Sequence, residues 1–164
     1  MHDARTALPR IKDFPYGRPP AAARHSARAE GTHVPMAHTI HDIGVASQIG
    51  SYSDAIEAKP NLRWLMTSGT PGLAVNGDGL PKGITGQAEL AWQHILSILG
   101  KAGMTVTDIV KVTQYLTRAD DMAAYAKVRT RYLGPARPAS MLLVIPQLVW
   151  PEILVEVEII AAKA

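Results

Sequence analysis

The sequence predicts an α+β domain in which two helices cover one face of a mixed β-sheet. Three short strand-like segments precede the first helical segment, one strand separates the two helices, and two strands follow the second. The order is therefore β-β-β-α-β-α-β-β. Helices and strands do not alternate strictly, which favours an α+β arrangement.

The segments before the first helix are short and are bounded by turn-forming residues. Strands are expected within residues 37–44, 51–58 and 62–69. A loop rich in glycine and proline then runs over residues 70–83.

The first helix is predicted over residues 84–102, because apolar residues recur at spacings of three and four. They are Ile84, Ala88, Ala91, Ile95 and Ile98. Gly103 is expected to end the helix, and "TVTD" (105–108) resembles a short capped turn. Residues 110–117 then alternate between apolar and polar, as a half-buried strand does.

The second helix is predicted within residues 117–135. Thr117 and Asp120 have the spacing of a capping box at its start, and Gly134 and Pro135 end it.

Two strands, over residues 139–146 and 152–162, complete the domain. Alternate residues of a strand point to opposite faces, so the last strand has one solidly apolar face, while Glu156 and Glu158 share the other. The spacing alone favours a solvated face for these two acids. The alternative is a ligand-facing or intersubunit surface, where partial burial would raise the pKa of a carboxyl group and suit it to proton transfer near neutral pH.

The length and composition indicate one globular domain. The chain has 164 residues, of which 47% are hydrophobic and 19% charged, and it has no cysteine. Disulfides, thiolate metal sites and cysteine nucleophiles are thereby excluded. No apolar run approaches the roughly 20 residues of a membrane-spanning helix, so no membrane partner is expected. We predict a cytoplasmic location, which the lack of cysteine suits.

The first 35 residues are predicted to be a basic extension, and the domain to occupy residues 36–164. Six of the 17 basic and three of the 14 acidic residues lie in the extension, so the domain carries eleven of each. A neutral domain disfavours nucleic acid as a partner. The lack of apolar periodicity favours a disordered extension. A transit peptide, or an upstream start codon with Met36 opening the functional chain, remains an alternative.

Motifs for other chemistry are weak. The histidines form no HxH or HExxH pattern, so no metal is expected. Ser68 lacks the flanking glycine of a GxSxG nucleophile elbow. The segment "NGDG" (76–79) lacks the Lys-Ser/Thr pair of a phosphate-binding loop.

Five motifs, in order and spacing, resemble the Rid family, also called the YjgF/YER057c/UK114 family. They are "IGSYSDAI" (49–56), "MTSGTPG" (66–72), the stretch 83–117, "RPAS" (137–140) and "VEVEIIA" (155–161). The resemblance covers about residues 45–162. It implies a chorismate-mutase-like (YjgF-like) α+β fold and a homotrimer that binds a small molecule in clefts between its subunits. It also implies hydrolysis of reactive enamines and imines, such as 2-aminoacrylate, to 2-keto acids and ammonia without a cofactor.

The resemblance further implies site residues. Glu156 corresponds to the glutamate that positions or activates the attacking water, and Tyr52 to a tyrosine that lines the cleft. Ser68 and Gly69 correspond to a Ser-Gly pair that lines the ligand pocket. The backbone of Met141, with that of Gly69, is expected to receive a carbonyl or carboxylate of the substrate.

Two positions depart from the family pattern. Deaminating members have an arginine that holds the substrate carboxylate, where this chain has Ser140, which lacks both the charge and the fork geometry. An alternative alignment keeps Arg137 in that role, but it needs four extra residues before Glu156 instead of one, which favours Ser140. Ala126 stands where many members have a polar asparagine near the cleft.

These departures favour a substrate other than 2-aminoacrylate, either larger or neutral. We therefore expect a Rid-like enamine or imine deaminase with a different substrate. The alternative, which loss of the arginine favours, is a non-catalytic trimer that binds a small metabolite. Ribonuclease activity comes third, because the domain is neutral.

Overall fold

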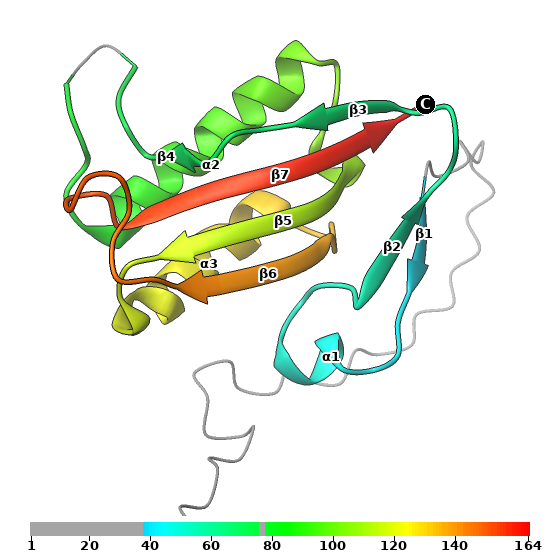
Figure 1. The fold of residues 1–164 in the computed structure, drawn as a ribbon, viewed down its shortest axis with the longest axis horizontal. Helices are drawn as coiled ribbons and strands as arrows, with labels where there is room; N and C mark the ends of the chain where they lie inside the picture. Colours follow the sequence, from blue (N-terminus) through cyan, green and yellow to red (C-terminus); the bar gives the residue numbers. More distant parts are fainter. Residues whose placement is uncertain (1–37, 76–77) are drawn as a thin grey trace, which may run out of the picture.

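The computed structural model describes residues 38–75 and 78–164, and it confirms the α+β class. Helices α2 (Gly83–Lys101) and α3 (Met122–Leu133) cover the same face of the main sheet (Figure 1). The predicted basic extension lies outside the described residues. In the two described ranges, no helix has the length and apolar character needed to cross a membrane.

The main sheet has the strand order β3-β7-β5-β6. Its strands are β3 (Arg63–Met66), β7 (Val155–Lys163), β5 (Ile109–Leu116) and β6 (Ala139–Val144), with the short β4 (Thr70–Pro71) also paired to β7. β5 and β6 are parallel, whereas β7 is antiparallel to β3, β4 and β5. The sheet is therefore mixed, as predicted.

The core lies between this sheet and the two helices. The predicted alternation of the last strand is confirmed, because its inward residues are fully buried and Glu156 and Glu158 are only half-buried on the other face. The core residues of β7 and α2 include Val155, Val157, Ile159, Ile84, Ala88, Ala91, Trp92 and Ile95.

A separate hairpin lies to the side of the main sheet (Figure 1). β1 (His38–His41) pairs antiparallel with β2 (Ala55–Ala58). Between them is a short helix that the sequence did not predict, α1 (Ala46–Ile49). The carboxylate of Asp54 accepts hydrogen bonds of 2.8–3.0 Å from three N–H groups within residues 43–46, and these bonds fold the segment into a turn.

The second long helix begins later than predicted. Neither Thr117 nor Asp120 caps it; a 3-10 turn (Ala119–Asp121) precedes α3 instead. The turn is fixed by a hydrogen bond of 2.7 Å from Arg118 Nε to Asp121 Oδ2. The capping-box prediction at this end was wrong, because an ion pair stabilises the turn in its place.

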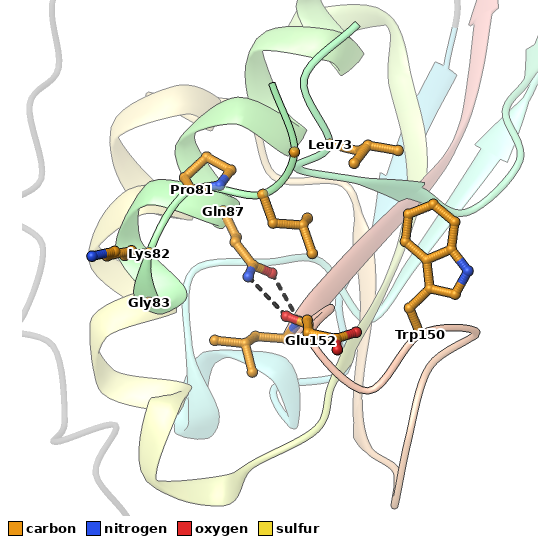
Figure 2. A pocket seen from close by; sticks show the side chains of 10 residues that line it. Leu73, Pro81, Lys82, Gly83, Gln87, Trp150 and Glu152 are labelled. Atoms are coloured by element: carbon orange, nitrogen blue, oxygen red, sulfur yellow. Dashed lines mark hydrogen bonds between the residues drawn. The ribbon is translucent and has the colours of Figure 1, made fainter. Parts of the chain in front are cut away.

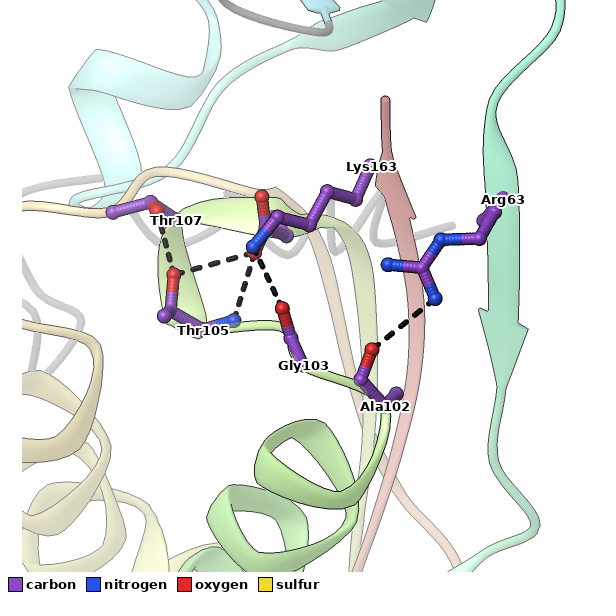
Figure 3. A network of polar contacts seen from close by, with 7 residues as sticks. Arg63, Ala102, Gly103, Thr105, Thr107 and Lys163 are labelled. Carbon is purple, nitrogen blue, oxygen red and sulfur yellow. Dashed lines mark hydrogen bonds and ion pairs between the residues drawn. The ribbon is translucent and has the colours of Figure 1, made fainter.

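A polar network joins the end of α2 to the sheet (Figure 3). Arg63 of β3 donates to the carbonyl of the α2 C-cap residue at 3.2 Å, and Lys163 of β7 donates to the carbonyl of Gly103 at 2.6 Å. Next to them, Thr105 and Asp108 form the capping box expected from "TVTD". These contacts fix the end of the helix against the ends of two strands.

Candidate functional site

The strand next to β7 is interrupted by a bulge. β3 and β4 pair with the same side of β7, and residues 67–69 connect them opposite only two residues of β7, 158–159. One extra residue on one strand is a β-bulge, a feature that re-aims side chains and is frequent beside active sites. Thr67 still exchanges hydrogen bonds with the β7 backbone, so the bulge falls on Ser68 and Gly69.

The carboxylate of Glu156 lies against this bulge. A Cβ added at Gly69 would collide with Glu156 Oε2, so the close approach requires glycine. The Glu156 side chain is half-buried, and this burial raises the pKa of its carboxyl group above the usual value. Ser68 is exposed beside it, and its carbonyl accepts a hydrogen bond of 3.1 Å from Thr70 Oγ1. We call Ser68, Gly69 and Glu156 the carboxylate cluster.

A second group of polar side chains lies on the helix side of the sheet. Ser140 Oγ accepts hydrogen bonds from Gln114 Nε2 at 3.0 Å and from Arg129 Nη2 at 3.3 Å. Tyr125 O–H donates to Gln114 Oε1 at 3.0 Å. We call Gln114, Tyr125, Arg129 and Ser140 the arginine cluster.

Tyr52 is held near the start of β6 through its neighbour in the chain. The next residue, Ser53, donates to the carbonyl of Arg137 at 2.7 Å and bridges to the start of β6. Burial raises the pKa of the Tyr52 hydroxyl, as does the charge of Asp54, while the charge of Arg129 opposes this rise.

The two clusters lie on opposite faces of the main sheet. Gln114 is fully buried on the helix side and holds Ser140 there. Glu156 is directly opposite Tyr115, the residue that follows Gln114, and so points to the outer face. One copy of the chain cannot bring the carboxylate of Glu156 next to the hydroxyl of Ser140.

Three further residues that were predicted to belong to the site lie outside both clusters. Met141 is exposed on the outer face, and its carbonyl accepts a hydrogen bond of 2.8 Å from Gln114 Nε2. Arg137 precedes β6 and its side chain is exposed. Ala126 is half-buried on α3, three residues before Arg129.

Gln114 and Arg129 were not predicted from the sequence. Gln114 had a readable signal, because the alternation of residues 110–117 places it on the apolar side, between Val112 and Leu116. Arg129 shares a helix face with Ala126 by spacing, but the spacing says nothing of its contact with β6.

An open hollow of ≈ 470 Å³ lies at the start of α2, and none of the predicted site residues lines it (Figure 2). Its walls include Leu73, Gln87 and Trp150. Gln87 Nε2 donates to the carbonyl of Glu152 at 2.9 Å, and Gln87 Oε1 accepts from the N–H of Leu154 at 2.8 Å. In the part of the chain that the structure describes, no three His, Asp or Glu side chains are placed to hold a metal ion.

Sequence comparisons identify relatives over most of the domain. The family model described as Endoribonuclease L-PSP matches residues 44–163. A RutC family protein of Pyrococcus horikoshii is 31% identical over 129 residues, which make up 78% of this chain and 99% of the relative. A RutC family protein of Pasteurella multocida is 28% identical over 133 residues, or 79% of this chain and 100% of the relative.

Solved structures have the same fold. RidA from an Antarctic Psychrobacter superimposes with a TM-score of 0.58 at 28% identity, covering 70% of this chain and 90% of its own. The Rid family protein YyfB from Yersinia pestis gives a TM-score of 0.69 over 78% of this chain and 100% of its own; its 23% identity bears on the fold alone. Because the family model matches residues 44–163, which are most of this chain, the chain belongs to the Rid (YjgF/RutC) family.

Proposed function

We propose that this protein is a Rid-type deaminase that hydrolyses a reactive imine, or the imine tautomer of an enamine, to a carbonyl compound and ammonia. The observation that carries the proposal is the position of Glu156, an acid on the last strand that is half-buried and is approached closely by Gly69. A carboxyl group whose pKa is raised in this way is suited to accept and return a proton near neutral pH.

In the proposed reaction, water attacks the imine carbon while one of its protons moves to the Glu156 carboxylate. The electron pair of the C=N bond moves to nitrogen, which then takes that proton, giving a carbinolamine. The hydroxyl proton of the carbinolamine is next transferred to nitrogen through the same carboxylate. The C–N bond breaks, ammonia leaves and the carbonyl forms. An activated C=N bond needs little more than a placed water and a proton acceptor.

We propose that the site is completed between two copies of the chain, in a homotrimer, with the ligand in the cleft. The separation of the carboxylate and arginine clusters by the sheet supports this arrangement, because only a second copy can bring them together. The outer face also exposes Trp64, Met66 and Met141, which are apolar side chains that an interface would cover. The cytoplasmic location remains a prediction.

The other residues have proposed roles in holding the ligand. Tyr52 and Ser68 would hydrogen-bond it, and the backbone of Gly69 and Met141 would receive its carbonyl or carboxylate. The reaction as written uses no metal or organic cofactor.

One observation favours a second candidate function. Ser140 carries no charge where deaminating relatives are expected to have an arginine, which supports a trimer that binds a small metabolite without converting it. RNA cleavage, which the description of the family model suggests, is disfavoured by the equal numbers of basic and acidic residues over 36–164.

The experiment measures keto-acid release from 2-imino acids that an amino-acid oxidase generates in place, with side chains of increasing size. We expect the wild type to accelerate release for the larger members and to act weakly on 2-iminobutanoate. Glu156→Gln should lower the accelerated rate at least about 100-fold. Glu158→Gln, which removes an acid from the same face two residues away, should stay close to the wild type.

Each result assigns the protein to one class. Binding of keto acids without acceleration for any imine would identify a binder. A Glu156→Gln variant that is folded and hydrolyses the imine as fast as the wild type would contradict the role of Glu156 in proton transfer.

A further inference from the structure

We infer that Arg129 of α3 supplies the positive charge that Ser140 does not, so that the arginine cluster binds the carboxylate of a carboxylate-bearing imine. The inference rests on the proposed function, since it assigns one end of the substrate in the same composite site. Of the two alternatives expected from the sequence, a larger or a neutral substrate, it favours a larger one that is anionic.

The side chain of Arg129 extends to Ser140 on β6, the position where an arginine is expected in deaminating relatives. Its Nη2 donates to Ser140 Oγ at 3.3 Å, from a helix on the same side of the sheet as that hydroxyl. The charge of Arg129 also acts on the hydroxyl of Tyr52. A guanidinium therefore lies against Ser140, although it comes from α3 and not from the strand.

The hydroxyl of Ser140 is left as a donor. A hydroxyl has two lone pairs and one proton. Ser140 Oγ already accepts from Gln114 and from Arg129, so its remaining capacity is to donate. Together with the guanidinium, this makes a group of hydrogen-bond donors on the helix side of the sheet. Such a group matches the oxygens of a carboxylate.

The hydroxyl is held in place before any ligand arrives. Gln114 is fully buried; its amide N–H groups donate to Ser140 Oγ and to the carbonyl of Met141, and its oxygen accepts from Tyr125. This network gives a physical reason for a glutamine on the apolar side of β5. A polar network with its partners in place fixes the side chains that it connects.

The other arginines of the described ranges are placed elsewhere. Arg131 pairs with Glu89 at 2.7 Å on the surface, and the Arg137 side chain is exposed before β6. Arg63 and Arg118 are engaged at the end of α2 and at the start of α3. Only Arg129 contacts Ser140 among the arginines that the structure describes.

The test measures binding of 2-oxobutanoate, a keto acid of the product class, and of its neutral amide by calorimetry. We expect the wild type to prefer the carboxylate, and Arg129→Gln to weaken carboxylate binding at least about tenfold without changing amide binding. Arg129→Lys should keep part of the preference, because it retains the charge without the fork. Arg131→Gln, on the same helix, and Arg137→Gln should bind as the wild type does.

Several results would overturn the inference. They are equal binding of the acid and the amide, no binding of the acid at millimolar concentration, or loss of binding in Arg137→Gln instead of Arg129→Gln. Should Arg129→Gln fail to fold, two other variants decide the inference. Arg129→Lys should bind the carboxylate more weakly than the wild type, whereas Arg137→Gln should bind it equally well. The inference and the proposed function fail separately: loss of the carboxylate preference bears on Arg129, whereas an unchanged rate of imine hydrolysis in Glu156→Gln bears on the reaction.

Discussion

At position 69, the absence of a side chain decides where a carboxylate can lie. An alanine there would push the flexible end of Glu156 aside while leaving the backbone unstrained. We expect Gly69→Ala to lower kcat at least about tenfold, since a small misplacement of a catalytic group is costly. Its melting temperature should stay near that of the wild type. Steady-state kinetics and a thermal melt measure both.

Gly100→Ala is the matched control. Nothing lies within 4 Å of a Cβ at this position of α2, so alanine should stabilise the helix by about 0.5–1 kcal/mol and leave kcat unchanged. If Gly69→Ala had full activity as well, the close approach of Gly69 to Glu156 would have no catalytic meaning.

The pH dependence of the reaction should report the burial of Glu156. A proton acceptor works in its ionised form, so kcat/KM should fall as the pH drops through a pKa above the ordinary value of 4.5. Stability has the opposite dependence: burial disfavours the charged form, so the wild type loses stability as the pH rises from 4.5 through the raised pKa. Glu156→Gln should therefore gain stability relative to the wild type near neutral pH. An acid limb at or below 4.5 would contradict this account.

Single residues of the site were predictable only in part. The alternation of the last strand predicted the face of Glu156, which the structure confirms, and the resemblance implied the role proposed for it. The contact of Gly69 with that carboxylate depends on a bulge, which pairs residues far apart in the sequence and leaves no local pattern. Arg129 and Ser140 lie on different elements, a helix and a strand. The spacing of residues within one element cannot predict a contact between two elements.

Among the elements, α2 and the start of β7 are joined through one buried side chain. Gln87 pairs with two backbone groups, on Glu152 and Leu154, and is almost fully buried. Gln87→Leu would leave both groups unpaired, and we expect it to lower the free energy of unfolding by roughly 2–4 kcal/mol. Chemical denaturation measures the loss.

Gln93→Leu, on an exposed position of the same helix, is the control. Gln93 is exposed and, among the described residues, its side chain bonds to Tyr132 alone, at 3.3 Å, so the change should stay within about 0.5 kcal/mol. Equal effects of the two substitutions would show that burial of the Gln87 amide is not what matters.

The long elements and the short strands β1, β2 and β3 were expected from the sequence, whereas α1 and β4 were not. The helix α2 and the strands β5 and β7 have periodic sequences, α3 was predicted from the signals at its ends and β6 from its apolar run, and the structure confirms all five. α1 and β4 are each formed by contacts outside themselves: α1 by the carboxylate of Asp54 and β4 by pairing with β7. The start of α3 was misplaced because Arg118 pairs with Asp121, an interaction that competes with capping.

At the scale of the whole molecule, the sheet separates the two halves of the candidate site. Its helix side carries Arg129 and Ser140, and its outer side carries Glu156. An assembly in which the outer face of one copy meets the β6 edge of the next would join them. We expect light scattering to give the mass of a trimer, and a stable active monomer would contradict the composite site.

Subunit mixing tests the central claim most directly. Glu156→Gln chains, expected to lose at least about 100-fold in rate, and Arg129→Gln chains, expected to lose at least about tenfold in kcat/KM, are unfolded together and refolded as mixed oligomers. Imine hydrolysis is then assayed at low substrate concentration. Because each site takes its halves from different chains, about one quarter of the sites should be intact and kcat/KM should recover to about that fraction of the wild type. If mixed oligomers form and activity stays at the level of the separate variants, both groups act within one chain or not in one site, and the account fails.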